Sequence, residues 1–241
     1  MIMSPTPNNL HTLHSFDVDL GRLNGELLEM AELLIHQLDH AIRALIRGDG
    51  EVAHKVGARH KKIEHLQSRI DNDVLSLIAR HCPVANDLRN VISTAKIAVE
   101  LSRIGDEIAE FAKLIGVLFD PNTSDPNQKL LSDIVKIGDL VKTILGKLVV
   151  VFETRDSKAA YALLECDRDC ELELQEGIKH QLSLVLNDAR VIRRSLDVME
   201  MMKALERCGE HCRSIAELAI FMLDGVDVRH GGRAPEQWFG S

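Results

Sequence analysis

Apolar residues recur every three or four positions along most of this 241-residue chain. The clearest example covers residues 17–47, where the repeating positions are Leu20, Leu23, Leu27, Met30, Leu34, Leu38, Ile42 and Leu45. This spacing places an apolar stripe along one side of an α-helix. The same pattern predicts five further helices, over residues 51–80, 84–118, 128–153, 158–186 and from about 190 to 223.

Short polar segments separate the first of these helices from their neighbours. The sequence "GDGE" at 48–51 contains two glycines, and Pro83 follows the second helix. Glycine and proline both disfavour helix interiors, so each segment marks a break. The turn "TRDS" at 154–157 offers Asp156 or Ser157 as the N-cap of the fifth helix.

The remaining breaks divide the chain into two halves. "FDPNTSDPNQ" at 119–128 contains two prolines and is the clearest linker, whereas "LNDAR" at 186–190 is a weaker break. We therefore predict a first three-helix bundle at 14–118 and a second at 128–224. The glycine-rich residues 225–241 are expected to form a loosely held C-terminal tail.

The two halves resemble each other in sequence. "LSRIGDEIAE" at 101–110 aligns without a gap with "LERCGEHCRS" at 205–214, an offset of 104 residues. "HKKIEHL" at 60–66 aligns with "DRDCELE" at 167–173, an offset of 107 residues. A repeat of this length indicates a duplicated bundle. The predicted fold class is all-α, with six long helices in two tandem, structurally similar three-helix bundles.

Composition and charge exclude several classes of protein. Aromatic residues make up only 3% of the chain, which favours packed helices over β-sandwiches. The net charge is −8 and no basic block is present, so nucleic acid is not an expected partner. We expect neither a signal peptide nor a membrane span, since no apolar run reaches about 18 residues. The five cysteines show no secreted-domain pattern, so the expected location is cytoplasmic.

Two pairs of carboxylates in the second half are candidate metal ligands. Asp167 and Glu171 lie four residues apart, as do Glu206 and Glu210. Each pair shares one helix face, and the pairs would converge if the fifth and sixth helices are antiparallel neighbours. Hard or borderline cations accept such oxygen ligands. The alternative is a solvated acidic surface.

The equivalent positions of the first half are less acidic. They are His60, Glu64, Ser102 and Asp106. A ring nitrogen of His60 can ligate a metal, although the residue can also be an exposed histidine among Arg and Lys neighbours. Ser102 is a poor ligand, so a first-half site is expected to be weaker or absent.

The cysteines have two interpretations. Cys166 with Cys170, and Cys208 with Cys212, are four residues apart and could form a zinc site if the pairs faced each other. The internal repeat instead places isoleucine at the positions equivalent to three of these four cysteines. We therefore predict that these thiols pack in the core. Gly105 and Gly209 occupy equivalent mid-helix positions in the two halves, which suggests a close approach between helices or access to the neighbouring carboxylate.

The sequence lacks the common catalytic motifs. We find no glycine-rich phosphate loop, no GxSxG, no HExxH and no CxxC. An enzyme would have to be a carboxylate-bridged metal catalyst, and the Glu-x-x-His pairs of di-iron bundles are missing. The protein is therefore expected not to be an enzyme.

The repeated segments resemble a known family. "LSRIGDEIAE" and "LERCGEHCRSIAE" are similar to the duplicated L-E-R-I-G-D-H-x-x-N-I-A-E signature of the PhoU family. "CPVANDLR" resembles the family's P-x-A-x-D-L-R segment. "SFDVDLGRLNGELLEMAELL" and "AIFMLDGVDVRH" resemble its opening helix and its closing stretch. The resemblance covers roughly residues 14–230.

The resemblance implies both a role and a set of ligands. It implies a non-enzymatic negative regulator, usually a homodimer, that links the ATPase of a phosphate ABC transporter to a phosphate-sensing histidine kinase. It also implies acidic motifs that hold Fe, Zn, Mn, Ni or Mg. The matching positions are Asp167, Glu171, Glu206, Glu210, His60, Glu64 and Asp106. An accessory protein of a low-affinity phosphate or metal permease remains the alternative.

Overall fold

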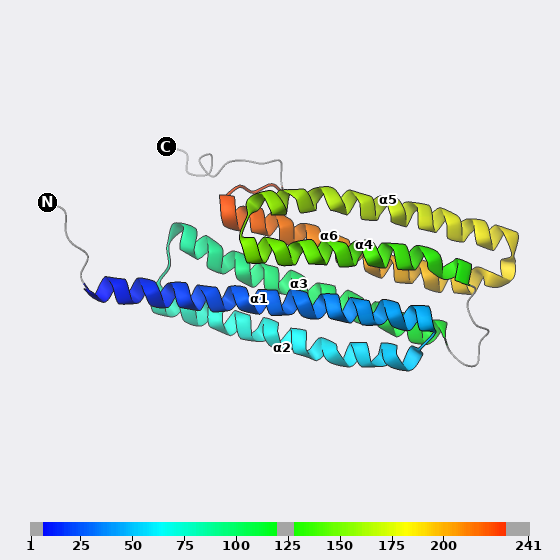
Figure 1. Ribbon diagram of the computed structural model, residues 1–241, viewed down its shortest axis with the longest axis horizontal. Helices are drawn as coiled ribbons and strands as arrows, with labels where there is room; N and C mark the ends of the chain where they lie inside the picture. The colour runs from blue at the N-terminus through cyan, green and yellow to red at the C-terminus, as the bar shows by residue number, and fades with distance from the viewer. Residues whose placement is uncertain (1–6, 120–127, 230–241) are drawn as a thin grey trace.

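The computed structural model describes residues 7–119 and 128–229, apart from the side chains of 7–14, 52–54, 57–59, 128–130 and 167–168. Six long α-helices and one short 3-10 helix make up this part of the chain (Figure 1). They are α1 (Pro7–Arg47), α2 (Gly50–His81), α3 (Ala85–Leu118), α4 (Gln128–Thr154), α5 (Ser157–Asn187), η1 (Ala189–Val191) and α6 (Ile192–Asp224). The predicted all-α fold of six helices is confirmed. The helix α1, however, begins ten residues before the predicted start at 17, since Pro7 is compatible with a first helical position.

In the second half, aspartates cap the beginnings of two helices and a glycine lies at the end of a third. Asp156 is the N-cap of α5, and its carboxylate accepts a hydrogen bond of 2.9 Å from the backbone N–H of Lys158. Asp188 likewise caps η1 by accepting from the backbone N–H of Arg190 at 3.1 Å. Gly225 ends α6 with a φ of 75°, a left-handed conformation that favours glycine. The breaks predicted at 154–157 and 186–190 are therefore present.

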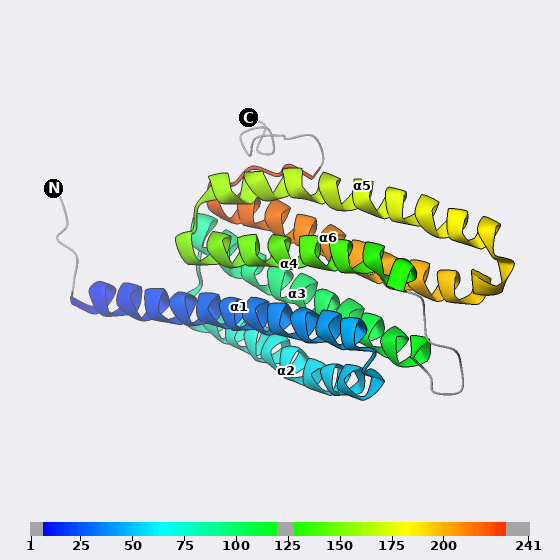
Figure 2. The same ribbon diagram turned by 45° about the vertical axis from the view of Figure 1, so that its right-hand side comes forward.

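The helices form two layers (Figure 2). One layer is a row of four helices in the order α2, α3, α6 and α5, in which each helix contacts the next. The other layer consists of α1, which packs on α2 and α3, and α4, which packs on α5 and α6. The helices α1 and α4 also contact each other, so the two three-helix units join through α1–α4 and α3–α6.

Two ion pairs show that α3 and α6 run antiparallel. The Arg207 guanidinium lies 2.6 Å from the Glu107 carboxylate, and Nδ1 of His211 lies 2.7 Å from Glu100. The residue numbers fall along α6 as they rise along α3. This hydrogen bond from His211 is the main reason that the pKa of Glu100 lies below its ordinary value.

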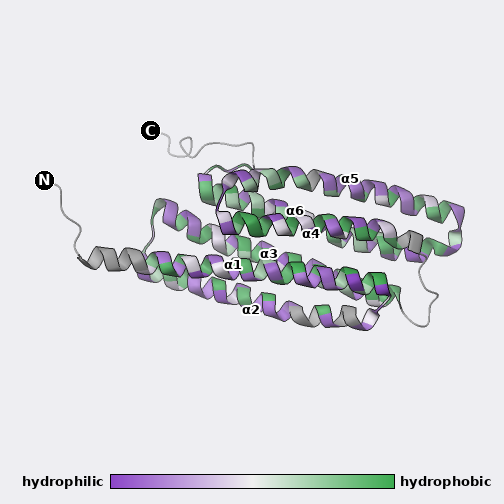
Figure 3. Ribbon diagram, in the orientation of Figure 1, coloured by the Kyte–Doolittle hydropathy of each residue, from purple (hydrophilic) through white to green (hydrophobic). Residues whose placement is uncertain are grey.

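Apolar residues fill the interior of both three-helix units and the boundary between them. Hydrophobic and hydrophilic positions alternate along each helix, as the amphipathic pattern requires (Figure 3). Cys208 and Cys212 are fully buried, and burial raises the pKa of the Cys208 thiol. Cys170 is also buried, so the prediction of core packing is confirmed for these three. Cys166 is only half-buried and lies 2.8 Å from Nζ of Lys147.

The structure describes only the first residues of the predicted C-terminal tail and little of the predicted linker. Residues 225–229 lie against the bundle, because Val226 and Val228 pack on the core. They are therefore held more closely than a loose tail would be. The rest of the predicted tail, 230–241, and the linker residues 120–127 lie outside the described residues. None of the helices in the described part of the chain has an apolar stretch long enough to span a bilayer.

Candidate functional site: acidic clusters on the outer face

Three of the predicted ligands in the second half line one surface depression. Glu171 of α5 and Glu206 and Glu210 of α6 face a depression of about 360 Å³. Its remaining lining residues are Cys170, Arg213, Ser214 and Glu217. The antiparallel packing of α5 on α6 brings the carboxylates together, as the sequence pattern predicted.

The charges in this cluster repel one another. The pKa of Glu206 is raised above its ordinary value, first by burial, then by the charge of Glu210 and more weakly by that of Glu171. Lys203 and Arg207 partly oppose the shift. None of the three carboxylates forms an ion pair with a residue whose side chain is described. The cluster is thus an accumulation of negative charge.

The described carboxylates of the second-half cluster do not converge on a common position for a metal ion. Within the described side chains, no group of three or more His, Cys, Asp or Glu residues is arranged to hold a metal ion. Asp167 lies on α5 one helical turn before Glu171, but its side chain is outside the described residues. Metal ligation by these four residues therefore stays a prediction.

In the first half, the buried His60 lies between the carboxylates of Glu64 and Asp106, at the position equivalent to the second-half cluster. Nε2 of His60 is 2.8 Å from the Asp106 carboxylate and 3.7 Å from that of Glu64. Only 11% of the His60 side chain is exposed, so the alternative of an exposed surface histidine is wrong. The orientation of the ring toward Asp106 does not suit a hydrogen bond, and neither ring nitrogen of His60 has a hydrogen-bond partner among the described side chains. Ser102 is buried.

Gly105 makes room for the His60 ring. A Cβ atom at position 105 would lie 2.7 Å from Nδ1 and 2.8 Å from Cε1 of His60. Such distances are too short for a carbon beside a buried ring, so the predicted close approach of α2 to α3 is present here. The His60 ring can therefore occupy this position only because residue 105 has no side chain.

Gly105→Ala should lower the free energy of unfolding by about 1–3 kcal/mol, because the overpacked ring must move. Gly146→Ala is the matched control, since no atom of the described residues lies within 4 Å of a Cβ atom at this helical position. We expect that variant to be up to about 1 kcal/mol more stable than the parent. Urea titrations of both variants and of His60→Ala/Gly105→Ala measure the effect. If the histidine truncation failed to restore stability, the steric explanation would be incorrect.

Glu217 also lines the second-half depression but is not among the predicted ligands. The predicted carboxylate pairs are four residues apart, whereas Glu217 lies seven residues after Glu210. Positions seven apart also share a helix face, so this spacing was available as a signal. Glu217 is paired with Arg213 at 3.3 Å, which makes it less available than the other three carboxylates.

The fold and the acidic clusters define an all-α protein built from two copies of one three-helix unit. A family model described as the PhoU domain matches this chain twice, over residues 27–115 and 134–219. The chain belongs to the PhoU family. The two matched segments correspond to the two internal repeats recognised in the sequence.

Curated relatives cover nearly the whole chain. The chain is 31% identical, over 222 residues, to a phosphate-specific transport system accessory protein PhoU homolog of Pseudomonas putida, covering 92% of this chain and 86% of the relative. It is 30% identical to the protein of the same name in Pseudomonas aeruginosa, with coverages of 92% and 90%.

Solved structures show the same architecture. The crystal structure of PhoU from Pseudomonas aeruginosa matches with a TM-score of 0.81 and 30% identity, covering 87% of this chain and 99% of that one. A phosphate transport system regulatory protein PhoU from Streptococcus pneumoniae matches with a TM-score of 0.78 over 88% and 99% of the two chains. At 24% identity, this second match supports the fold alone.

Proposed function

We propose that this protein is a non-enzymatic negative regulator of phosphate uptake and of phosphate-starvation signalling. It links a phosphate ABC transporter to a sensor histidine kinase in the cytoplasm by binding the transporter ATPase and the kinase through its helical faces. The observation that carries the proposal is membership of the PhoU family across both repeats. Relatives of this family are named as accessory proteins of phosphate-specific transport.

The acidic clusters give this regulator a place for metal ions. Carboxylate oxygens are the ligands that hard cations prefer, and Glu171, Glu206 and Glu210 supply an acidic surface without ion-pair partners among the described side chains. These residues, with Asp167, would hold Fe, Zn, Mn, Ni or Mg. The bound ion would supply positive charge that offsets the repulsion between the carboxylates. In the first half, His60, Glu64 and Asp106 offer fewer carboxylates and hence a weaker site.

Deletion of the gene tests the regulatory role directly. In cells grown with abundant phosphate, loss of the protein should switch on phosphate-starvation genes, because a negative regulator is missing. Transcript levels of those genes report the result, and the same strain carrying the parent gene on a plasmid is the control. Unchanged repression in the deletion strain would show that the protein does not have this function.

A further inference from the structure

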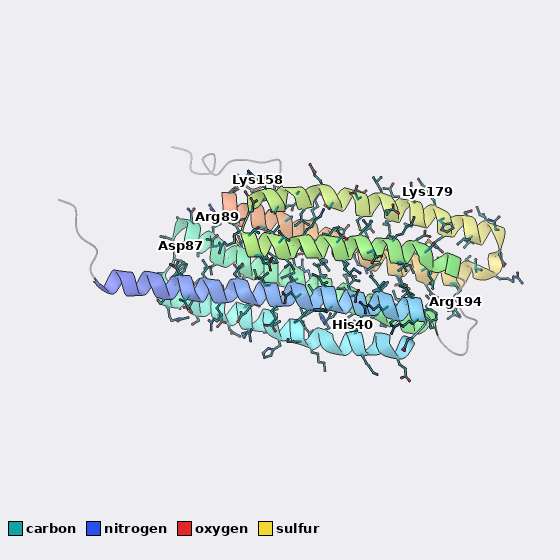
Figure 4. The ribbon with its side chains drawn as sticks, viewed as in Figure 1. His40, Asp87, Arg89, Lys158, Lys179 and Arg194 are labelled. Atoms are coloured by element: carbon teal, nitrogen blue, oxygen red, sulfur yellow. The ribbon has the colours of Figure 1, made fainter. Side chains whose placement is uncertain are left out.

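The sequence "HQLDH" at 36–40 of α1 places two histidines four residues apart. Residues with this spacing share one face of a helix, with Cβ atoms about 5–6 Å apart. The HExxH helix of metalloproteases uses the same histidine spacing to bind zinc through two imidazoles. His36 and His40 are both exposed, so an ion in solution can reach them without a change in the fold. Figure 4 shows His40 on the part of α1 that is nearer its C-terminal end.

A hydrogen bond fixes the orientation of the His40 ring. Its Nδ1 lies 2.6 Å from the backbone carbonyl oxygen of His36. A carbonyl oxygen can only accept a hydrogen bond, so Nδ1 carries the hydrogen, and Nε2 of the neutral ring has the free lone pair. Histidines that ligate metals usually donate their second ring N–H to a carbonyl or carboxylate in this way, which fixes the tautomer and strengthens the ligand. The local structure therefore prepares Nε2 of His40 to bind a metal ion.

The second ligand and a nearby carboxylate lie on the same face of α1. The His36 side chain forms no hydrogen bond or ion pair with any residue whose side chain is described. Glu32 is exposed one helical turn before His36, and it also lacks an ion pair with the described side chains. No three His, Cys, Asp or Glu side chains in the described part of the chain surround a common position. The remaining positions on an ion bound by the two histidines are thus left to water or to a ligand from solution.

Two cations beside the histidine pair are occupied by acidic partners. Arg43 follows His40 by three residues, and its guanidinium lies 2.8 Å from the Asp39 carboxylate. On the side of α2 that faces α1, Nζ of Lys62 lies 2.9 Å from the carboxylate of Glu29. Neither positive charge is therefore directed at the histidines without a compensating negative charge.

The charges toward the α1–α2 turn are also balanced. Arg47 lines a surface depression together with Asp49 and Glu51. Lys55 of α2 follows Glu51 by four residues, a spacing at which opposite charges attract each other. Acidic and basic side chains are thus matched at this end of α1, and Glu32 adds a negative charge on the other side of the pair. The charges around the two histidines therefore do not repel a divalent cation.

We propose that His36 and His40 chelate a divalent transition ion of the class that favours imidazole ligands, namely Zn²⁺, Ni²⁺ or Cu²⁺. The site is separate from the acidic clusters, which offer mainly oxygen ligands on the four-helix row, whereas α1 lies in the other layer. Gln37 stands where HExxH has its general base, and an amide cannot take up a proton. The site therefore binds an ion without hydrolysing a substrate. This inference does not rest on the proposed function.

A zinc titration of the full-length protein near neutral pH tests the site. The readout is the NMR spectrum of protein that carries isotope-labelled histidine, in which the ring signals of His36 and His40 should shift together. His36→Asn and His40→Asn should each weaken zinc binding at the remaining ring at least about ten-fold, because a chelate needs both ligands. Glu32→His/His40→Asn moves the pair by one helical turn along α1, and it should restore the response of the ring at position 36.

Two controls separate this site from other zinc ligands. His65→Asn removes an exposed histidine of α2 that has no second histidine four residues away, and the shifts of His36 and His40 should be unchanged. Glu206→Gln/Glu210→Gln removes carboxylates of the second-half cluster and should also leave those shifts unchanged. Circular dichroism confirms that each variant is folded. The proposal is overturned if the two rings do not respond to zinc, if either single variant binds as tightly as the parent, or if moving the pair fails to restore binding.

Discussion

Replacing Phe111 with alanine should lower the free energy of unfolding by about 3–5 kcal/mol. Phe111 is among the largest side chains that are fully buried, and it lies on α3, which packs against α1, α2 and α6. Truncation removes apolar contact and leaves a cavity that surrounding helices only partly fill. Because α3 belongs to one half and contacts the other, we expect both halves to lose stability in a single transition.

Urea titration followed by circular dichroism measures this change. Val117→Ala on the same helix is the matched control, because that side chain is 47% exposed, and its effect should stay within about 0.5 kcal/mol. A loss below about 1 kcal/mol for Phe111→Ala would contradict the central position of α3. Two separate transitions would show that the halves unfold independently.

Glu206→Gln/Glu210→Gln should lower the affinity for Mn²⁺ or Zn²⁺ by roughly 100-fold or more, since even outer-shell changes at metal sites cost 10–100-fold. At an ion concentration about 100 times the Kd, the parent protein should gain about 2.7 kcal/mol of stability. The variant should gain little. Metal analysis after dialysis and thermal unfolding with and without the ion give both quantities, and Glu153→Gln, an exposed carboxylate on α4, is the control.

In metal-free protein the sign of the mutational effect should reverse. The pKa of Glu206 is raised by burial and by Glu210, so the folded state favours the protonated acid. That contribution is fully present below the ordinary pKa of 4.5 and is lost as the pH rises through the folded-state value. At pH 7, Glu206→Gln should therefore be more stable than the parent by a few tenths of a kcal/mol. The difference should vanish near pH 4, and equal stability of the two proteins at both pH values would show that neither burial nor Glu210 disfavours the charged form of Glu206.

Much of the fold was predictable because periodicity and local breaks are properties of adjacent residues. The apolar stripe of 17–47, the cap at Asp156 and the break at 186–190 all depend on neighbours within one or two helical turns. The start of α1 at Pro7 was not predicted, because residues 7–16 lack the strong apolar stripe that marks the rest of that helix.

Only part of the candidate site was predictable, because spacing along one helix does not show contacts between helices. Spacing along one helix identified Glu206 with Glu210, and the internal repeat assigned Cys208 and Cys212 to the core. Spacing alone did not show that His60 would be buried. That depends on Gly105 of another helix, whose missing side chain leaves room for the ring.

By itself, the sequence determined the helices, their duplication and the face on which each carboxylate lies, since helical geometry follows from local spacing. The tertiary structure decided which faces meet. Only the antiparallel packing of α3 on α6 pairs Glu100 with His211, and only that of α5 on α6 gathers Glu171 beside Glu206. These relations join residues distant in sequence, and they depend on how whole helices bury their apolar stripes against one another.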